Sequence, residues 1–197
     1  MFQSLGARPF AVPAPVFLVG SYTTDNCPNI MTAAWGGIVA SQPPCMAVSL
    51  QRVRASYTAI LERQAFTLNI PSADMVAEVD FAGLVSGKKT NKFKALNLTP
   101  LAAEHVDAPL VAECPVAIEL KLMHTLELGS HVQLVGEVMD VKIHKDCLDE
   151  QNLPLMGRIN PLLFVPLCRE YWTAGEMAAK AFSVGRSIVR PLLDEQP

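Results

Sequence analysis

Charged side chains are scarce in this chain, and neither sign dominates. Asp, Glu, Lys and Arg make up 18% of the 197 residues, and the formal net charge is −3. The sequence therefore lacks both the basic field that holds nucleic acid and the acidic excess of a disordered, solvated chain. We expect no nucleic-acid partner, and any anion site has to be local.

The cysteines show no pattern of a disulfide framework. The chain has five, an odd number, and no CxxC pair. Such usage fits reduced thiols in a cytosol, with most of the cysteines acting as small core residues. The N-terminus has no basic segment followed by an apolar run, and no stretch of about 18 apolar residues is present to cross a bilayer. We therefore expect a cytoplasmic protein without membrane contact.

The common signatures of nucleotide and hydrolytic sites are also missing. The sequence contains no GxGxxG, GxxxxGK[ST], HExxH or Gly-x-Ser-x-Gly, which argues against Rossmann, P-loop, zinc-protease and hydrolase sites. None of the four histidines has zinc-like spacing to another histidine or to a cysteine, so we interpret each as a surface or strand-end residue and expect no metal. They are His105, His124, His131 and His144.

Apolar residues, in contrast, are plentiful. They make up 50% of the chain, enough for one domain to bury a core without disulfide or metal support. We predict a single domain over residues 1–186. Residues 187–197, with Pro191 and Pro197, are interpreted as a tail or as an arm on a partner subunit.

Five short apolar or alternating runs have the length and the bounding residues of strands. They cover residues 16–19, 46–50, 66–70, 116–122 and 132–143. The last two, joined by a turn at 127–130, predict a long antiparallel hairpin, and Gly136 within it predicts a β-bulge.

Two short helices are predicted between the strands. One has Ser56 as its N-cap and continues to Arg63, and the other begins at Ser72 with Asp74 in its first turn. Strands outnumber helices and regular helical crossovers are absent. The pattern therefore favours a mainly β fold, an antiparallel Greek-key barrel with peripheral helices, over a doubly wound sheet.

Cations gather beside hydroxyl residues in two stretches, residues 51–57 and 86–94, which hold six of the sixteen Lys and Arg side chains. A phosphate group binds where cations, hydroxyls and free backbone N–H groups meet, and a helix starting at Ser56 would direct its amides at such a group. Each charge-assisted hydrogen bond contributes roughly 1.5–3 kcal/mol. The alternative is two solvated surface loops.

Small residues surround a tryptophan in the segment 29–37, Asn-Ile-Met-Thr-Ala-Ala-Trp-Gly-Gly. Small side chains let a flat ligand approach the backbone, Trp35 offers an apolar surface, and Thr32 adds a hydroxyl. An isoalloxazine ring needs such a slot with backbone amides. The alternative is that Trp35 only packs in the core.

These segments occur in an ordered series from Pro15 to Gly185 that resembles the flavin reductase-like, FMN-binding split-barrel family, in particular its flavoredoxin branch. The landmarks are Asn29-Ile-Met-Thr-Ala-Ala-Trp35, Pro43-Pro44 before Ala47-Val-Ser-Leu50, Arg54-x-Ser56-Tyr57, Phe66-x-Leu-Asn69-Ile-Pro71, Asp80-x-x-Gly83, Ser86-Gly87-Lys88, Lys92-Phe93 and Gly136-Glu137-Val138.

The resemblance implies that FMN binds at the interface of a homodimer. The residues it places along the ring system are Met31, Thr32, Ala33, Ala34, Trp35, Ser49 and Leu50. Those it places at the phosphate are Arg54, Ser56, Ser86, Gly87, Lys88 and Lys92. Lys92 is favoured among the lysines because the neighbouring Phe93 should hold its helix turn against the barrel. Tyr57 belongs either to this site or to the core.

The implied activity is that of an oxidoreductase passing hydride or electrons between flavin and NAD(P)H or a redox protein. Because the flavin itself accepts the hydride, no catalytic side chain is assigned. Two alternatives stay open. One is a flavoredoxin-type electron carrier without nicotinamide activity, and the other is a non-catalytic split barrel that binds another phosphorylated ligand.

Overall fold

A seven-stranded antiparallel sheet organises the chain in the computed structural model, which describes residues 1–186; the predicted tail at 187–197 lies outside the described residues. In spatial order its strands are β3 (Pro28–Ala33), β2 (Phe17–Tyr22), β6 (Ala65–Ile70), β9 (Val116–Leu128), β10 (His131–Ile143), β5 (Pro44–Leu50) and β4 (Gly36–Ser41). Three hairpin pairs, β2 with β3, β4 with β5 and β9 with β10, are neighbours in this sheet, whereas β3 and β4, consecutive in the sequence, lie at its two edges.

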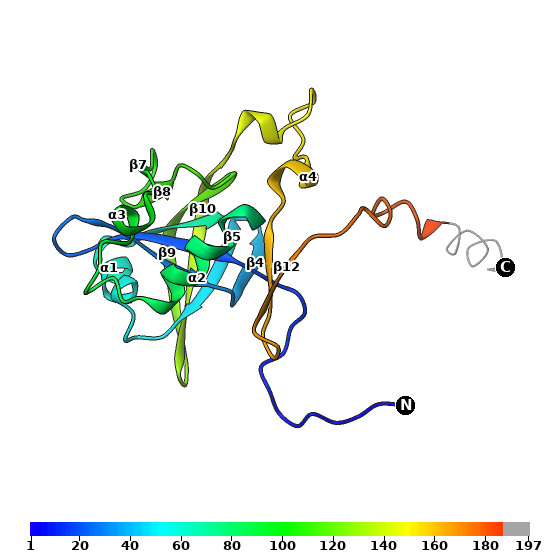
Figure 1. The fold of residues 1–197 in the computed structure, drawn as a ribbon, viewed down its shortest axis with the longest axis horizontal. Coiled ribbons are helices and arrows are strands. Elements are labelled where there is room, and N and C mark those ends of the chain that lie inside the picture. The colour runs from blue at the N-terminus through cyan, green and yellow to red at the C-terminus, as the bar shows by residue number, and fades with distance from the viewer. Residues whose placement is uncertain (187–197) are drawn as a thin grey trace.

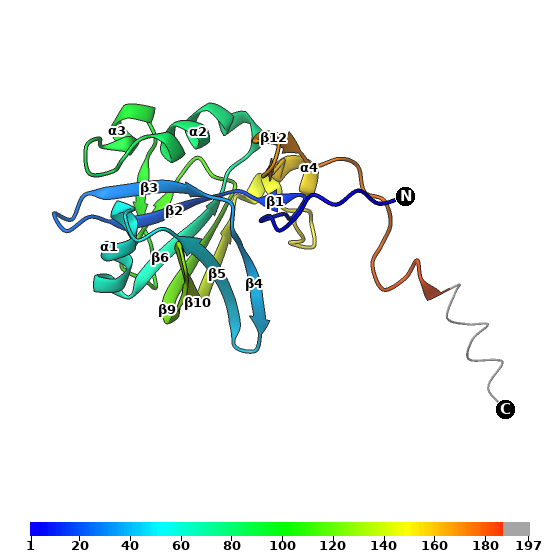
Figure 2. The same ribbon diagram turned by 90° about the horizontal axis from the view of Figure 1, so that it is seen from below.

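The sheet has to curl because its two edges are consecutive in the chain. Strands β3 and β4 lie at opposite edges, yet only Ala34 and Trp35 separate them, and a link of this length reaches about 11 Å. The Ser49 amide of β5 also donates to the Trp35 carbonyl oxygen at 2.8 Å. The edges consequently meet near Trp35, and the sheet closes into the barrel seen in Figure 2.

The barrel interior holds the larger apolar core. Phe66, Leu120 and Leu134 are fully buried there, on three neighbouring strands. Strand β2 is buried on both faces, with Phe17 and Val19 in this core and Leu18 in a second one. This double burial explains why β2 appears in the sequence as an uninterrupted apolar run rather than as an alternating one.

The second core lies between the outer face of β2 and β3 and two helices. Helix α2 (Val76–Leu84) follows the 3-10 turn η1 (Ala73–Met75), and α3 (Lys92–Leu96) is a short helix beyond it. Val79 of α2 and Phe93 of α3 are buried against Leu18 and Ile30. Figure 2 shows both helices beside β3, with α1 (Ala55–Arg63) at the end of the barrel.

The remaining elements are small. A three-stranded sheet combines β1 (Ala14–Pro15), β11 (Leu162–Val165) and β12 (Glu170–Thr173), and a two-stranded sheet combines β7 (Pro100–Ala102) and β8 (Pro109–Val111). Two short helical turns precede β11, η2 (Lys145–Cys147) and α4 (Met156–Ile159). The N-terminal segment and the chain after β12 extend away from the barrel in Figure 1. No helix within residues 1–186 is both long and apolar enough to span a membrane.

The predicted mainly β fold with peripheral helices is confirmed, and each predicted strand is present. The hairpin turn is tighter than predicted, since β9 continues to Leu128 and β10 begins at His131. The β-bulge at Gly136 is confirmed by a register shift between Val135 and Gly136. Three of the five cysteines are buried and all are free thiols, in agreement with the core role expected for most of them.

Candidate functional site

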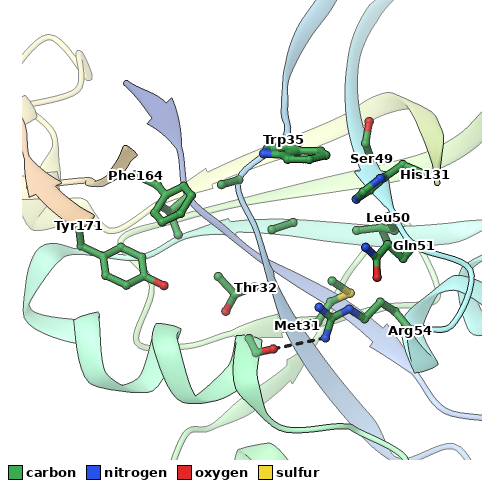
Figure 3. A pocket seen from close by; sticks show the side chains of 14 residues that line it. Met31, Thr32, Trp35, Ser49, Leu50, Gln51, Arg54, His131, Phe164 and Tyr171 are labelled. Atoms are coloured by element: carbon green, nitrogen blue, oxygen red, sulfur yellow. Dashed lines mark hydrogen bonds between the residues drawn. The ribbon is translucent and has the colours of Figure 1, made fainter. Parts of the chain in front are cut away.

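Two adjoining cavities lie where β3 leads into β4. The first, the aromatic cavity, has a volume of ≈ 250 Å³, and the second, the basic cavity, ≈ 210 Å³. Met31 and Arg54 line both. The two cavities therefore form one cleft along β3, with an aromatic end and a cationic end. Figure 3 shows the side chains that line the aromatic cavity, with Arg54 at its border.

Backbone and small side chains of residues 31–35 form the floor of the aromatic cavity. The Thr32 hydroxyl donates to the Val79 carbonyl oxygen at 2.5 Å, which ties this strand to α2. Gly83, also of α2, borders the cavity, and a Cβ there would lie 3.4 Å from Cβ of Thr32. The close approach of helix and strand makes a flat slot of the kind that a planar ring occupies.

Trp35 forms a wall of the cavity. Its side chain is 42% exposed, and its ring lies 4.6 Å from that of His131, tilted by 39°. The alternative that Trp35 only packs in the core is therefore wrong. His131 begins β10, and its Nδ1 is hydrogen-bonded to the Ser130 hydroxyl at 2.8 Å.

An aromatic pair from the small sheet forms the opposite wall. Phe164 of β11 and Tyr171 of β12 have ring centroids 5.6 Å apart. Figure 3 shows the two rings side by side at the border of the cavity. The Tyr171 hydroxyl donates to Asp80 at 3.2 Å. Burial, together with the charge of Asp80, raises the pKa of Tyr171 to about 12, so the phenol remains a hydrogen-bond donor at neutral pH.

A buried lysine lies in the basic cavity. Lys92 is 2% exposed, and its ammonium group donates one hydrogen bond, to the Ala82 carbonyl oxygen at 2.6 Å. An ammonium group has three N–H donors, so the remaining donors are available to a ligand. Burial, assisted by the charge of Arg54, lowers the pKa of Lys92 to about 8. An anion bound in this cavity would attract the charged ammonium group and so raise the pKa of Lys92 again.

The N-terminus of α1 borders the same cavity. Arg54 is the N-cap, with extended backbone and no side-chain capping bond, and Ser56 lies inside the first turn. The prediction of Ser56 as the N-cap is wrong, because its hydroxyl is buried and accepts a hydrogen bond from Nδ2 of Asn29 at 3.0 Å. The uncapped first-turn amides and the helix dipole favour an anion here.

The sequence matches a family model described as a flavin reductase-like domain over residues 10–167. The chain belongs to the flavin reductase-like family. This membership confirms the resemblance, including the split-barrel fold, and it supports flavin as the cofactor.

Two solved structures are similar over nearly the whole chain. Flavoredoxin of Desulfovibrio vulgaris (Miyazaki F) is 52% identical with a TM-score of 0.90, covering 94% of this chain and 100% of that one. Flavoredoxin from Methanosarcina acetivorans is 29% identical with a TM-score of 0.89, covering 95% and 99%. The flavoredoxin branch of the family is thereby confirmed.

Similarity to curated proteins is more partial. A ferric-chelate reductase (NAD(P)H) of Archaeoglobus fulgidus is 27% identical over 55% of this chain and 63% of its own length. The chain covers less than two thirds of the length of the first curated relatives that it matches. It covers 64% of the length of a protein from Archaeoglobus fulgidus and 65% of the length of one from Aeropyrum pernix.

Most of the residues predicted for the flavin site line the cleft of this flavin reductase-like protein. In the aromatic cavity these are Met31, Thr32, Ala33, Ala34, Trp35, Ser49, Leu50 and Arg54. In the basic cavity they are Met31, Arg54, Ser56, Ser86, Gly87 and Lys92.

Three predicted residues line neither part of the cleft. Tyr57 packs against the barrel core, one of the two places expected for it. Phe93 is buried in the second core, where it holds the turn that carries Lys92. Lys88 lines a third, adjoining cavity instead.

Several lining residues were not predicted, because their positions depend on strand pairing. His131 faces the cavity after a tight hairpin turn, and Phe164 and Tyr171 come from a sheet far along the chain. Gln51 follows directly after β5. Asn29 and Gly83 belong to the family landmarks, which was the one available signal for them.

A cluster of possible metal ligands lies elsewhere. Ligand atoms of Glu104, His105 and Asp140 come within 4.8 Å of one another. The ammonium group of Lys142 already lies 2.8 Å from Asp140 and 3.1 Å from Glu104. It also lies 3.5 Å from the buried Glu119. Lys142 thus forms ion pairs with the two carboxylates of this cluster and with Glu119.

Proposed function

We propose that this chain binds FMN along the cleft, with the isoalloxazine ring in the aromatic cavity and the phosphate in the basic cavity. The observation that carries the proposal is the continuity of the two cavities through Met31 and Arg54. FMN has one flat end and one doubly charged end, and the cleft offers a matching partner for each.

The phosphate end is supported by the donors gathered there. Lys92 and Arg54 supply two cations, and the first turn of α1 supplies backbone amides beside Ser56. Each charge-assisted hydrogen bond contributes roughly 1.5–3 kcal/mol, so a phosphate held by this set needs no glycine-rich loop.

The ring end is supported by the shape and polarity of its walls. Trp35 and the pair Phe164 and Tyr171 supply apolar surface, while Thr32 and the neighbouring backbone supply polar edges. When bound, FMN supplies the redox chemistry by accepting hydride or electrons at its ring. The residues of the chain hold the ring, exclude water from part of it and leave the remaining face open to a donor.

We propose an NAD(P)H-dependent flavin reductase-like oxidoreductase as the activity. The test is anaerobic mixing of the FMN-loaded protein with NADH or NADPH, followed by absorbance near the flavin visible band. Bleaching with either nucleotide supports the proposal. A flavin that keeps its colour with both nucleotides contradicts it.

The second candidate is an electron carrier whose flavin is reduced by a protein. It is favoured by the 52% identity to a flavoredoxin. Reduction by a ferredoxin-type donor, without reduction by nicotinamide, would select this candidate. A colourless preparation that takes up no added FMN would instead select a non-catalytic split barrel for another phosphorylated ligand.

We further propose that the protein forms a homodimer, that it is located in the cytoplasm, and that residues 1–186 form one domain. Strand β4 is an edge of the large sheet and carries Ile38, 81% exposed, and Val39, 51% exposed. An exposed apolar edge strand invites pairing with a second chain. Strand β4 begins directly after Trp35, so a partner subunit paired with β4 would also cover the aromatic cavity.

A further inference from the structure

The segment that follows β12 is apolar and yet exposed. Residues 174–186, which we call the arm, lead away from the barrel in Figures 1 and 2. Every residue from 175 to 186 is exposed, and the exposed fraction reaches 78% for Met177 and 96% for Phe182. Seven of the thirteen residues of the arm are apolar, whereas disordered, solvated segments are poor in aromatic and other apolar residues. The composition of the arm therefore favours a segment that packs against another surface.

A groove of matching character lies behind Trp35. Its volume is ≈ 260 Å³, and we call it the apolar groove. Its walls come from the stretch 9–15, from residues 34–36 and from Pro166. All of the described residues that line it are Pro, Ala, Phe, Trp or Gly. A groove with such walls suits an apolar side chain better than a charged ligand.

The apolar groove adjoins both the flavin site and the edge of the large sheet. Ala34 and Trp35 line the aromatic cavity as well as the groove. Gly36, the first residue of β4, also lines the groove, and it borders a further cavity together with Ile38 and Val39. The groove is therefore continuous with the edge at which a second copy is proposed to pair. A side chain in the groove would pack directly against Trp35.

Strand β4 alone is too small to hold two copies together. A stable interface typically takes about 20–30 residues from each partner, and β4 has 6 residues. The arm is the segment able to supply more contacts. From Thr173, the last residue of β12, the chain can extend by up to about 30 Å before Phe182. In a two-fold dimer the same contact occurs twice, so each copy would receive the arm of the other.

We propose that the arm of a second copy of this chain binds in the apolar groove, with the Phe182 side chain packed against Trp35. This inference rests on the proposed FMN site and homodimer. An aromatic side chain in an apolar pocket is a common anchor of a protein interface. The flavin site of each subunit is then complete only in the dimer, because its Trp35 wall is supported by the partner.

A disulfide between chains tests the contact directly. One chain carries Ala11→Cys in the groove, and a second chain with a different tag carries Phe182→Cys. Both also carry Cys27→Ser and Cys168→Ser, which remove the exposed native thiols. We expect mild oxidation to link the two chains, as detected on a non-reducing gel and by mass spectrometry of the joined peptides. Leu101→Cys, exposed on the sheet of β7 and β8, is the control and should not link to Phe182→Cys.

A charge on the arm tests its effect on the flavin site. We expect Phe182→Asp to raise the dissociation constant of the dimer at least about tenfold, measured by sedimentation velocity. FMN affinity should fall about threefold or more, because dimerisation and FMN binding are then coupled. In flavin-free protein with Trp172→Phe, which leaves Trp35 as the single tryptophan, the same variant should shift the emission of Trp35 to longer wavelength. Ser183→Asp, exposed at the next position of the arm, is the matched control and should change none of these values.

The outcomes separate this inference from the proposals on which it rests. A disulfide within one chain identifies the arm of the same copy as the occupant and overturns the exchange. A link from Ala11→Cys to Phe2→Cys, an exposed position, in place of Phe182→Cys also overturns it. Normal dimerisation and FMN affinity in Phe182→Asp contradict the anchor. A wild type that binds no FMN overturns the proposed function, whereas the disulfide still decides where the arm binds.

Discussion

The buried ammonium group of Lys92 is the residue on which the phosphate site most depends. Replacing Lys92 by Met keeps the side-chain length and removes the charge. We expect FMN affinity to fall roughly 10- to 100-fold, since one charge-assisted bond of roughly 1.5–3 kcal/mol is lost. Titration with the flavin measures this effect. Lys94→Met, on the same helix but exposed, is the control, and equal affinities for wild type and Lys92→Met remove Lys92 from the site.

The lowered pKa of Lys92 predicts how flavin affinity depends on pH. With a ligand-free pKa of about 8, Lys92 carries its charge below pH 8, and a bound phosphate raises that pKa. Binding above pH 8 must therefore take up a proton, so affinity falls as pH rises through 8. The phosphate loses its second charge below about pH 6, which leaves a maximum between these values.

Dissociation constants between pH 5 and 10 test this dependence. The decline above pH 8 should disappear in Lys92→Met, because the titrating group is gone. A wild-type affinity that stays constant from pH 7 to 10 contradicts the role of Lys92.

Sequence reasoning at the residue scale succeeded where a side chain and its neighbours are adjacent in the chain. Lys92 was favoured because Phe93 follows it, and Phe93 is indeed buried. The same reasoning placed Ser56 at the N-cap, because residue type alone does not distinguish a capping hydroxyl from one that accepts from Asn29, 27 positions away. His131 is a strand-end residue, as predicted, but its contact with Trp35 was not predicted, and Lys88 lines a separate cavity. Both sets of surroundings come from segments distant in the chain.

At the scale of single elements, the hairpin of β9 and β10 depends on its bulge. A Cβ on Gly136 would lie 2.9 Å from Cβ of Leu120 and 2.9 Å from the Phe66 ring. We expect Gly136→Ala to lower the free energy of unfolding by about 1–3 kcal/mol through overpacking.

Urea unfolding provides the measurement, and Gly157→Ala provides the control. Gly157 lies in α4, and a Cβ added to it would meet no atom within 4 Å. Gly157→Ala should therefore raise the free energy of unfolding by up to about 1 kcal/mol. Unchanged stability of Gly136→Ala contradicts the tight packing at the bulge.

Strands bounded by proline or glycine were predictable because their apolar runs are continuous or alternate clearly. Strand β6, ending before Pro71, and the long hairpin are examples. Strands β11 and β12 were not predicted. They are short and only partly buried, so their residues carry little periodic signal although they supply Phe164 and Tyr171 to the site.

At the scale of the whole molecule, the proposed homodimer makes a prediction of its own. Sedimentation velocity should give a mass about twice the 21.4 kDa of the chain. Ile38→Glu should shift the protein to monomer and weaken FMN binding, because a charge on β4 opposes pairing at the edge. Leu101→Glu, at an exposed apolar position on the separate sheet of β7 and β8, should do neither. A monomeric wild type contradicts the dimer.

The barrel itself was predictable from the ordered landmarks, whereas its closure was not. Only the position of β3 and β4 at opposite edges of the sheet reveals that Ala34 and Trp35 bring these edges together. Because the sheet closes at this point, the small residues before Trp35 form the floor of the cleft.

The central claim is that two connected cavities bind FMN, one holding its isoalloxazine ring and the other its phosphate. Parallel titration of the flavin-free protein with FMN and with riboflavin, which lacks only the phosphate, tests it most directly. We predict that FMN binds at least 100-fold more tightly than riboflavin at pH 7. Equal affinity for the two flavins would contradict a phosphate held by Arg54, Ser56 and Lys92.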